Sequence, residues 1–600
     1  MGQFFIVQGR RGAPVEPLFA ETEQIFAALF GAFPAERLLD PANGIAVAKY
    51  DRSSGRTSRI TSAPSNTAWA CGAGTFFLNG QSGDAALQSL VERWSRDPAA
   101  VLRDLDGMFA LIHCEPSSRL LEVLTDRLGI LHLFKAEKDS CVILSTSSMA
   151  LAALLQPAWD DLSCREFLAT GSVFDNRTLF QGVEKLPAAT IIRYEEGQER
   201  RRTRYWSLAN FEYTREDAVP RLASALESAF QTIQSSYKKP ALDLTGGFDS
   251  RVLVGIAMRT RGSIDTVVTG PDTERDVVVS KLIAREFDLP HQHHVPESLT
   301  PHALWESAKA SLLVTDGECD VFEYAHVLET QESQSRQFDI GINGSNGAMY
   351  KGYWWQSAFP FTGWRGHFSP ERFATRRLAA GCEPEGLLQG SFPDTLPQHF
   401  AELIRLANKG LERHPNTAQI DNVYLRLRLE RWQGRLASST NRVAPNVSPL
   451  AFREPMEAAL TATPPQRVRG RLPRRLLQYL NPRLAALPLA QGYPAMPLRL
   501  TTCHRFGPLA VEVGRAVLKR LGTRSPAIPH VNSYRDLWSV EEAREVLNPG
   551  SMLTIGLYKP ASLTALFADV RNTYSRQIHS FRRVVTLELL AERIRDCAAH

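Results

Sequence analysis

One glycine-containing stretch, residues 241–251, constrains the fold of this chain more than any other. An apolar run ends at Leu244, two glycines follow at Gly246 and Gly247, and a helix-forming run begins after Ser250. This order predicts a strand, a tight turn and a helix, because glycine lets a backbone turn sharply and approach a ligand closely. The free N–H groups and the dipole at the start of that helix favour an anion. We therefore predict a phosphate-binding turn here.

The turn also contains one carboxylate, Asp249. A carboxylate beside phosphate is explained if it holds a divalent cation that bridges to the phosphates. The order Thr-Gly-Gly-Phe-Asp-Ser, residues 245–250, resembles the pyrophosphatase loop of enzymes that split ATP into AMP and pyrophosphate. It differs from the Walker loop, which needs a lysine after its last glycine. On these six residues alone, a plain tight turn explains the pattern equally well.

The residues after the turn favour the nucleotide interpretation. Residues 264–270 form a second apolar, β-branched run, residues 274–287 an amphipathic helical run, and a third strand is expected from His291. Strands that alternate with helices are typical of a parallel sheet, which binds nucleotides at the carboxyl ends of its strands.

Length and composition limit the number of domains and the kinds of partner that this chain can have. A chain of 600 residues is expected to hold two or more domains. A net charge of +5 gives no reason to expect a nucleic-acid partner. The eight cysteines are scattered without a CxxC pair, which fits a reduced cytoplasmic compartment. The first residues lack the pattern of a signal peptide, and no apolar run has membrane-spanning length, so no membrane partner is expected.

The first 200 residues predict two packed sheets with helices outside. Short apolar or β-branched runs alternate with helical stretches such as residues 86–94 and 164–169. The expected strands are Phe4–Val7, Gly44–Lys49, Thr75–Leu78, Met108–His113, Leu120–Thr125, Cys141–Ser145 and Thr190–Tyr194.

Three phrases in this region resemble one family. They are Leu-Asp-Gly-Met-Phe-Ala at 105–110, Thr-Asp-Arg-Leu-Gly-Ile-Leu-His-Leu at 125–133, and Thr-Leu-Phe-Gln-Gly-Val-Glu-Lys-Leu-Pro at 178–187. Together with the loop at 245–250, they resemble the glutamine-dependent asparagine synthetases and their relatives, the β-lactam synthetases and lasso-peptide cyclases. The resemblance covers roughly residues 1–500.

The resemblance implies an α/β fold in three parts. Residues 1–205 are expected to form a degenerate glutaminase-like αββα sandwich. Residues 206–500 are expected to form a parallel-sheet ATP-pyrophosphatase domain, and residues 501–600 its helical extension.

The resemblance also implies ATP and Mg²⁺ as cofactors, with Asp249 as metal ligand and with Asp249 and Ser250 as catalytic residues. The residues implied to bind ATP are Leu244, Thr245, Gly246, Gly247, Phe248, Asp249, Ser250, Val268, Thr269 and Gly344.

The chain departs from the family where glutamine would be hydrolysed. The family's glutaminase uses a cysteine directly after the initiator methionine, whose thiol attacks glutamine. Here that position is Gly2, and the next cysteine is Cys71. Asn79-Gly80-Gln81 stands where Asn-Gly-Glu is expected. We therefore expect a domain that no longer hydrolyses glutamine.

Two further departures lie in the synthetase part. Residues 341–353 resemble the loop that carries a second magnesium-binding aspartate in the family, and Ala348 is expected at its position, with Ser345 and Asn346 as neutral oxygen donors nearby. A downstream lysine that neutralises pyrophosphate is not evident near residues 491–493. Arginines that could replace its charge, or form a solvated basic face, are Arg467, Arg469, Arg471, Arg474 and Arg475.

Two clusters of polar residues are ambiguous. His291, His293 and His294 fit either a metal site or a strand that begins with imidazoles, and the second interpretation is favoured. The acidic run at residues 315–324 fits either a helix start rich in carboxylates or a substrate-recognition site.

These features predict an ATP-dependent ligase that adenylates a carboxylate and transfers it to an amine without glutamine hydrolysis. Peptide or natural-product biosynthesis is the expected setting, with lasso-type macrolactam formation as one form of it. The expected partners are a carboxylate and an amine substrate, with a precursor peptide or a partner protein left open. The alternatives are an asparagine synthetase that uses ammonia and a non-catalytic protein with the same fold.

Overall fold

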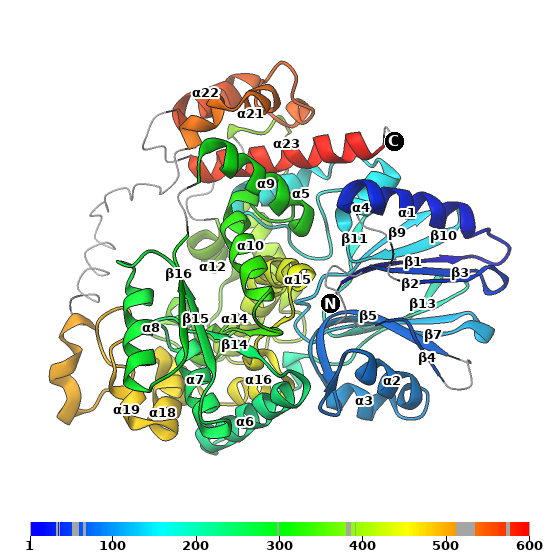
Figure 1. Ribbon diagram of the computed structural model, residues 1–600. Coiled ribbons are helices and arrows are strands. Elements are labelled where there is room, and N and C mark those ends of the chain that lie inside the picture. The colour runs from blue at the N-terminus through cyan, green and yellow to red at the C-terminus, as the bar shows by residue number, and fades with distance from the viewer. Residues whose placement is uncertain are drawn as a thin grey trace.

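The computed structural model shows a mixed α/β protein with antiparallel sheets first and a parallel sheet later (Figure 1). This confirms the expected order of sheet types. The described residues are 2–31, 34, 36–50, 59–63, 68–296, 299–379, 386–390, 392–509, 511, 534–571 and 577–598. Met1 and Cys382 lie outside them.

Two antiparallel sheets form the first half. One has the strand order β11-β9-β10-β1-β3-β2, and the other has β13-β12-β8-β7-β5-β4, with β6 paired to β5. The first comprises β1 Gln3–Gly9, β2 Glu36–Asp40, β3 Ile45–Tyr50, β9 Phe134–Lys138, β10 Cys141–Ser145 and β11 Glu184–Lys185. The second comprises β4 Thr61–Ser62, β5 Trp69–Leu78, β6 Gln81–Ser82, β7 Leu105–Glu115, β8 Leu120–Thr125, β12 Thr190–Glu195 and β13 Gln198–Arg204.

The two sheets pack face to face between two helical layers. Alternation along β1 explains this, because Phe4 and Ile6 enter the core between the sheets while Phe5 and Val7 face helices. α1 (Glu16–Phe30) and α4 (Ser148–Leu155) cover one sheet, and α2 (Gly83–Trp94) and α3 (Pro98–Asp104) cover the other (Figure 1). The arrangement is the αββα layering expected from the sequence.

The second half is built on a five-stranded parallel sheet in the order β16-β15-β14-β17-β18. Its strands are β14 Pro240–Asp243, β15 Asp265–Thr269, β16 His291–His294, β17 Ile340–Ile342 and β18 Asn446–Val447. The helices that flank or connect them are α6 Ala218–Ser236, α7 Asp249–Thr260, α8 Arg275–Glu286, α9 Pro301–Thr315 and α10 Val321–Ser335. The strand order reverses between β14 and β17, so a crevice is expected at their carboxyl ends.

Helices form most of the rest of the chain. Those beside the parallel sheet are α11 Ala348–Lys351, α12 Pro370–Phe373, α13 Leu396–Ala407, α14 Asn416–Val423, α15 Gly434–Val443, α16 Arg453–Leu460, α17 Pro464–Arg467, α18 Arg471–Leu480 and α19 Pro482–Ala486. A π-helical segment, Tyr424–Gln433, joins α14 to α15. Near the end of the chain lie α21 Glu541–Val546, α22 Pro560–Val570 and α23 Ile578–Ala598. None of the helices in the described ranges combines the length and apolarity needed to cross a membrane.

A buried ionic cluster joins the two halves. Arg442 of α15 contacts Asp316 at 2.6 Å, and Arg435 contacts the same carboxylate at 3.4 Å. The hydroxyl of Ser147, before α4, donates to Asp316 at 2.9 Å. The carboxylates of the acidic run therefore pair with arginines of another helix. Asp320 caps α10, where it accepts from the N–H of Phe322, and it also pairs with Arg582 of the C-terminal helix at 2.9 Å.

The last helix, α23, also packs against both halves. Its apolar side shares one core cluster with α1, α4 and α5 (Asp161–Thr170), and with residues of α9 (Figure 1). Arg593 donates to the carbonyls of Ala28 and Leu29 at the end of α1, at 2.7 Å each. The expected boundaries at residues 205 and 500 stay predictions, and α23 is more than an extension of the parallel-sheet part.

Candidate functional site

The predicted phosphate loop lies at the point where the strand order reverses. β14 ends at Asp243, residues 244–248 form the turn, and α7 begins at Asp249. The loop after β17 lies directly against it, because a Cβ on Gly344 would fall 2.8 Å from the backbone nitrogen of Ser250. Gly344 therefore has to be a glycine for these two loops to meet.

Hydrogen bonds within the protein hold the loop in shape. The hydroxyl of Ser250 accepts from the N–H of Thr245 at 3.1 Å and lies 3.0 Å from its side-chain oxygen. The N–H of Gly247 donates to Thr245 Oγ1 at 3.3 Å. The carboxylate of Asp276, in the first turn of α8, accepts from the N–H of Gly246 at 2.8 Å. A carboxylate thus already occupies one anion-binding N–H of the loop.

The other residues implied to bind ATP are divided between two places. Leu244 is buried and donates its N–H to the carbonyl of Val267 at 2.8 Å, which fixes the loop to the neighbouring strand. Val268 and Thr269 lie at the end of β15, paired with His293 and His294. They are not on the wall of the pocket that Asp249 and Gly344 share.

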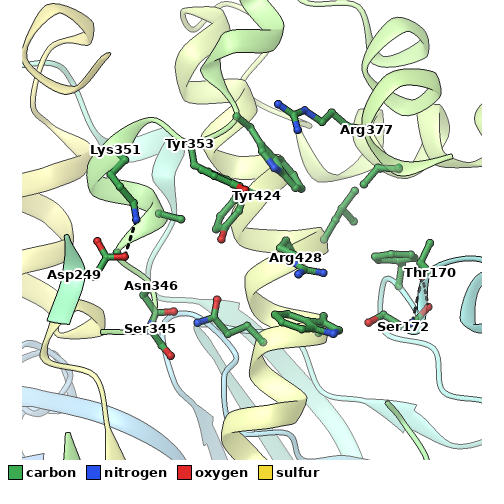
Figure 2. Close-up of a pocket in the computed structure, with 18 of the residues that line it drawn as sticks. Thr170, Ser172, Asp249, Ser345, Asn346, Lys351, Tyr353, Arg377, Tyr424 and Arg428 are labelled. Atoms are coloured by element: carbon green, nitrogen blue, oxygen red, sulfur yellow. Dashed lines mark hydrogen bonds and ion pairs between the residues drawn. The ribbon is translucent and has the colours of Figure 1, made fainter. Parts of the chain in front are cut away.

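The carboxylate of Asp249 forms an ion pair with a lysine. Lys351 Nζ lies 2.7 Å from Asp249 Oδ2, and each side chain is 24% exposed. Figure 2 shows the lysine pointing from α11 onto this carboxylate. Sequence analysis did not predict this contact, which joins residues far apart in the chain.

The structure also corrects the register of the loop after β17. A Cβ on Gly347 would overlap the carboxylate of Asp249, so Gly347 is the residue that faces it directly. Ala348, to which the sequence assigned that place, is one residue later and begins α11. The turn at Asn346, with φ of 73°, sets this register.

The residues present do not fit a divalent cation held by Asp249. In nucleotide sites Mg²⁺ takes near-octahedral coordination from one or two free carboxylates, the substrate phosphates and waters. Here the one carboxylate is already neutralised by an ammonium group, and the facing position has no side chain. The described part of the chain contains no group of three or more His, Cys, Asp or Glu side chains arranged to hold a metal, the strand of histidines included.

A short hairpin from the C-terminal side covers the loop. Leu489 and Tyr493 pair across it, and Ala490 at its tip donates its N–H to the carbonyl of Gly246 at 3.0 Å. This is the region where the family's pyrophosphate-neutralising lysine was expected. The side chain that reaches the loop is therefore a methyl group.

The arginines proposed to replace that lysine do not do so as a group. Arg467 is fully buried and pairs with Asp421 at 2.8 Å, so it is not on a solvated face. Arg475 pairs with Asp217 on the surface at 2.6 Å. Arg474 contacts the loop, with its guanidinium 4.8 Å from the ring centre of Phe248. It also donates to two carbonyls of the chain, at 2.9 Å each.

A pocket of about 690 Å³ opens beside Asp249. Its walls combine aromatic rings with cationic side chains (Figure 2). Residues that line it include Asp249, Asn346, Lys351, Tyr353, Trp354, Arg377, Tyr424, Arg428, Trp432 and Arg583. Arg428 stacks on Trp432 with its guanidinium 3.6 Å from the ring centre. A pocket of this size holds a small molecule or one or two side chains of a peptide.

Asn346 adds an unpaired polar atom to this pocket. Its side chain is 4% exposed, and its Oδ1 has no hydrogen-bond partner among the described residues. A buried acceptor without a donor is costly unless a ligand or water satisfies it. Asn346 therefore points to a ligand that donates a hydrogen bond.

The glutaminase position has no room for a nucleophile. Gly2 has φ of 86°, and a Cβ on it would overlap the carbonyl oxygen of Tyr50. Lys49 is buried beside it, 1% exposed. Cys71 is also fully buried, and burial raises the pKa of its thiol to about 12, which leaves it inert.

Comparison with known families identifies part of the chain. Residues 79–206 match the family profile of a glutamine amidotransferase domain. The protein contains an amidotransferase-type domain. The match covers a minor part of the 600 residues, so it leaves the parallel-sheet half unassigned. No curated protein matches the chain.

Two solved structures resemble it weakly. One is the glutamine phosphoribosylpyrophosphate amidotransferase of B. subtilis complexed with ADP and GMP, with 8% identity, a TM-score of 0.24, and coverage of 48% of this chain and 65% of that one. The other is described as the allosteric regulatory enzyme of purine biosynthesis, with 10% identity, a TM-score of 0.25, and coverage of 50% and 81%. The chain thus spans 65% of the first enzyme's length. At TM-scores this low, neither likeness supports a conclusion about fold or chemistry.

Proposed function

We propose that this protein is an amide-bond-forming ligase that activates a carboxylate with ATP and passes the acyl group to an amine, without hydrolysing glutamine. The observation that carries the proposal is the position of the loop at residues 245–250. It follows the central strand of the parallel sheet, at the point where the strand order reverses, and it borders a pocket of about 690 Å³. Open α/β sheets bind their ligands at this point.

The proposed chemistry has two steps. A carboxylate oxygen of the substrate attacks the α-phosphorus of ATP, the bond to the β-phosphate breaks, and pyrophosphate leaves. The amine then attacks the carbonyl carbon of the acyl-adenylate, AMP leaves, and the amine loses a proton to solvent. In this scheme the loop and Lys351 hold the phosphates, and the catalysis comes from positioning and charge neutralisation.

Three features of the pocket wall support this proposal. Arg428 supplies a fixed positive charge for a carboxylate, since it lies on the pocket wall with its guanidinium stacked on Trp432. Asn346 Oδ1 is an acceptor without a donor among the described residues, which suits the N–H of an amine. The rings of Tyr353 and Tyr424 extend the wall with apolar surface, which favours an acyl group larger than that of aspartate. A precursor peptide fits this description as well as a small acid does.

A second candidate function is a non-catalytic protein that keeps the fold. The observation in its favour is that several groups of the loop already have partners within the protein. Asp249 is paired with Lys351, the N–H of Gly246 is paired with Asp276, and Ala490 covers the loop. Binding of ATP and release of pyrophosphate separate the two candidates.

The decisive experiment places a charge on the loop. A Cβ at Gly247 meets no atom closer than 3.4 Å, so we expect Gly247→Asp and its neutral, equal-sized control Gly247→Asn to fold. We expect Gly247→Asp to weaken ATP binding by roughly tenfold or more, because a carboxylate repels the phosphates at short range. Gly247→Asn should stay close to the wild type. Titration calorimetry with ATP measures both, and equal affinities for the two variants would reject the loop as the nucleotide site.

Turnover is tested separately. Wild-type protein with ATP and a panel of amino acids, peptides and other carboxylates should release pyrophosphate with at least one of them. Adding hydroxylamine should trap the acyl-adenylate as a hydroxamate of defined mass. If ATP binds at the loop and no carboxylate in a broad panel gives pyrophosphate, the non-catalytic candidate is favoured.

A further inference from the structure

We propose that the ammonium group of Lys351 takes the place of a divalent cation at the phosphate loop, so that the site binds nucleotide phosphates free of metal. The inference rests on the proposed function, because it assumes that the loop binds a nucleotide. It adds a role for a residue that no motif assigns. It also changes the form in which the nucleotide is expected to bind.

The first argument is the position of the charge. Lys351 Nζ lies 2.7 Å from Asp249 Oδ2, on the wall of the pocket next to the loop. A cation that bridges this carboxylate to a phosphate would have to occupy the same region. A divalent ion placed there would meet a fixed positive charge at short range, which opposes its binding.

The second argument is that the lysine is held in place. The carbonyl of Met349, two residues earlier, accepts from the guanidinium of Arg467, which is fully buried and also pairs with Asp421. Tyr350 donates its hydroxyl to the carbonyl of Leu450 at 2.7 Å. The two residues before Lys351 are therefore both held by hydrogen bonds, which fixes the backbone of α11 at Lys351. Preorganised charge of this kind loses little entropy when a phosphate binds.

The third argument is donor capacity. A lysine ammonium has three N–H donors. Within the described part of the chain, Asp249 is its one hydrogen-bond partner, which leaves two donors for phosphate oxygens. Lysine binds phosphate in this way as a point charge in other nucleotide sites. The facing position, Gly347, leaves no room for a second carboxylate that would require a metal, since a Cβ there overlaps Asp249.

The test compares ATP binding with and without metal. Calorimetric titrations with ATP are run in EDTA and in excess Mg²⁺, on wild type and on Lys351→Met, Lys351→Arg and Lys309→Met. The last variant is a matched control, because Lys309 pairs with Glu542 on the surface and is not on the pocket wall. Circular dichroism and thermal melts confirm that each variant is folded.

We expect wild-type protein to bind ATP in EDTA within about threefold of its affinity in Mg²⁺, because Lys351 already neutralises the site. Lys351→Met should lose on the order of tenfold or more in EDTA and recover part of this loss in Mg²⁺, since Asp249 is then free for the ion. Lys351→Arg and Lys309→Met should keep metal-free binding.

Two outcomes overturn the inference and leave the proposed function standing. The first is that the wild type binds ATP in Mg²⁺ but not in EDTA. The second is that Lys351→Met binds ATP in EDTA with the same affinity as the wild type. Absence of ATP binding in both buffers is a different result, since it rejects the proposed function and with it the role of Lys351.

Discussion

The backbone N–H of Ala490 donates a hydrogen bond of 3.0 Å to the carbonyl of Gly246. This contact places the tip of the hairpin on the loop at residues 245–250, and a Cβ on Gly246 would come within 2.9 Å of the Ala490 methyl group. The side chain of Ala490 therefore lies against the loop, and it carries no charge.

A lysine at this position should strengthen phosphate binding. We expect Ala490→Lys to raise the affinity for pyrophosphate by roughly threefold to tenfold, because it adds a cation within reach of the loop. Ala490→Met is the control, since it adds a similar length without charge. Titration with inorganic pyrophosphate at two salt concentrations checks this, and the gain should shrink at the higher one. A gain of equal size in Ala490→Met would mean that charge is not its cause.

The amidotransferase-type domain should have no glutaminase activity, and a single substitution should not restore it. Gly2→Cys brings a Cβ into overlap with the carbonyl oxygen of Tyr50. It also places a residue with a side chain at a positive φ that only glycine adopts without strain. We expect no glutamate release from glutamine by wild type or by Gly2→Cys, and a lower melting temperature for the variant. Glutamate release above a blank by either pure protein would contradict this.

The ionic cluster between the halves should be essential for stability. Asp316 is fully buried and contacts both Arg435 and Arg442. Asp316→Asn leaves two buried arginines without their shared carboxylate, so we expect the free energy of unfolding to fall by about 3–5 kcal/mol. Glu542→Gln, which breaks the exposed pair with Lys309, should cost about 1 kcal/mol or less. Chemical denaturation of both variants measures the difference, and similar losses would show that burial does not decide it.

One half-buried carboxyl at the end of β14 should make stability depend on pH. Desolvation raises the pKa of Asp243, at the end of β14, from 3.8 to about 7. The folded state then holds a proton that the unfolded state releases above pH 3.8, so the stability it contributes falls as pH rises from about 4 to 7.

Asp243→Asn removes that dependence. We expect it to raise the free energy of unfolding at pH 8 by at most about 4 kcal/mol, and by about 2–3 kcal/mol more at pH 8 than at pH 5, since one pKa unit is 1.36 kcal/mol. Denaturation midpoints at the two pH values measure this. A gain that is equal at both would show that the carboxyl is not protonated near neutral pH.

Local sequence pattern predicted the regular elements well. The helical run expected at residues 274–287 matches α8, and the strands expected at Leu120–Thr125 and Cys141–Ser145 match β8 and β10. These segments carry strong apolar periodicity and clear turn residues at their ends, so neighbours in the sequence are enough to define them.

The sequence predicted only the part of the candidate site that lies within one short motif. The loop at 245–250 keeps the expected turn before α7, because its glycines and Ser250 act within six residues. The pairing of Asp249 with Lys351 depends on two loops that meet across the sheet, and no local pattern encodes it. The register error at Ala348 has the same origin. A positive φ at Asn346 decides which residue faces Asp249, and sequence pattern alone does not reveal it.

The helix α23 has a consequence for how the protein is made. Arg593 satisfies the carbonyls at the end of α1, and Arg583 donates to the carbonyl of Leu168 near the end of α5 at 2.8 Å. The outer layer of the N-terminal half is thus completed by residues that lie far downstream of it in the chain and are synthesised after it. Until then the apolar residues of α1, α4 and α5 that contact α23 lack this cover, and a nascent chain with such surface is prone to aggregate. We expect chaperone dependence during translation, and a chain released before residue 578 should be a substrate for cellular proteases.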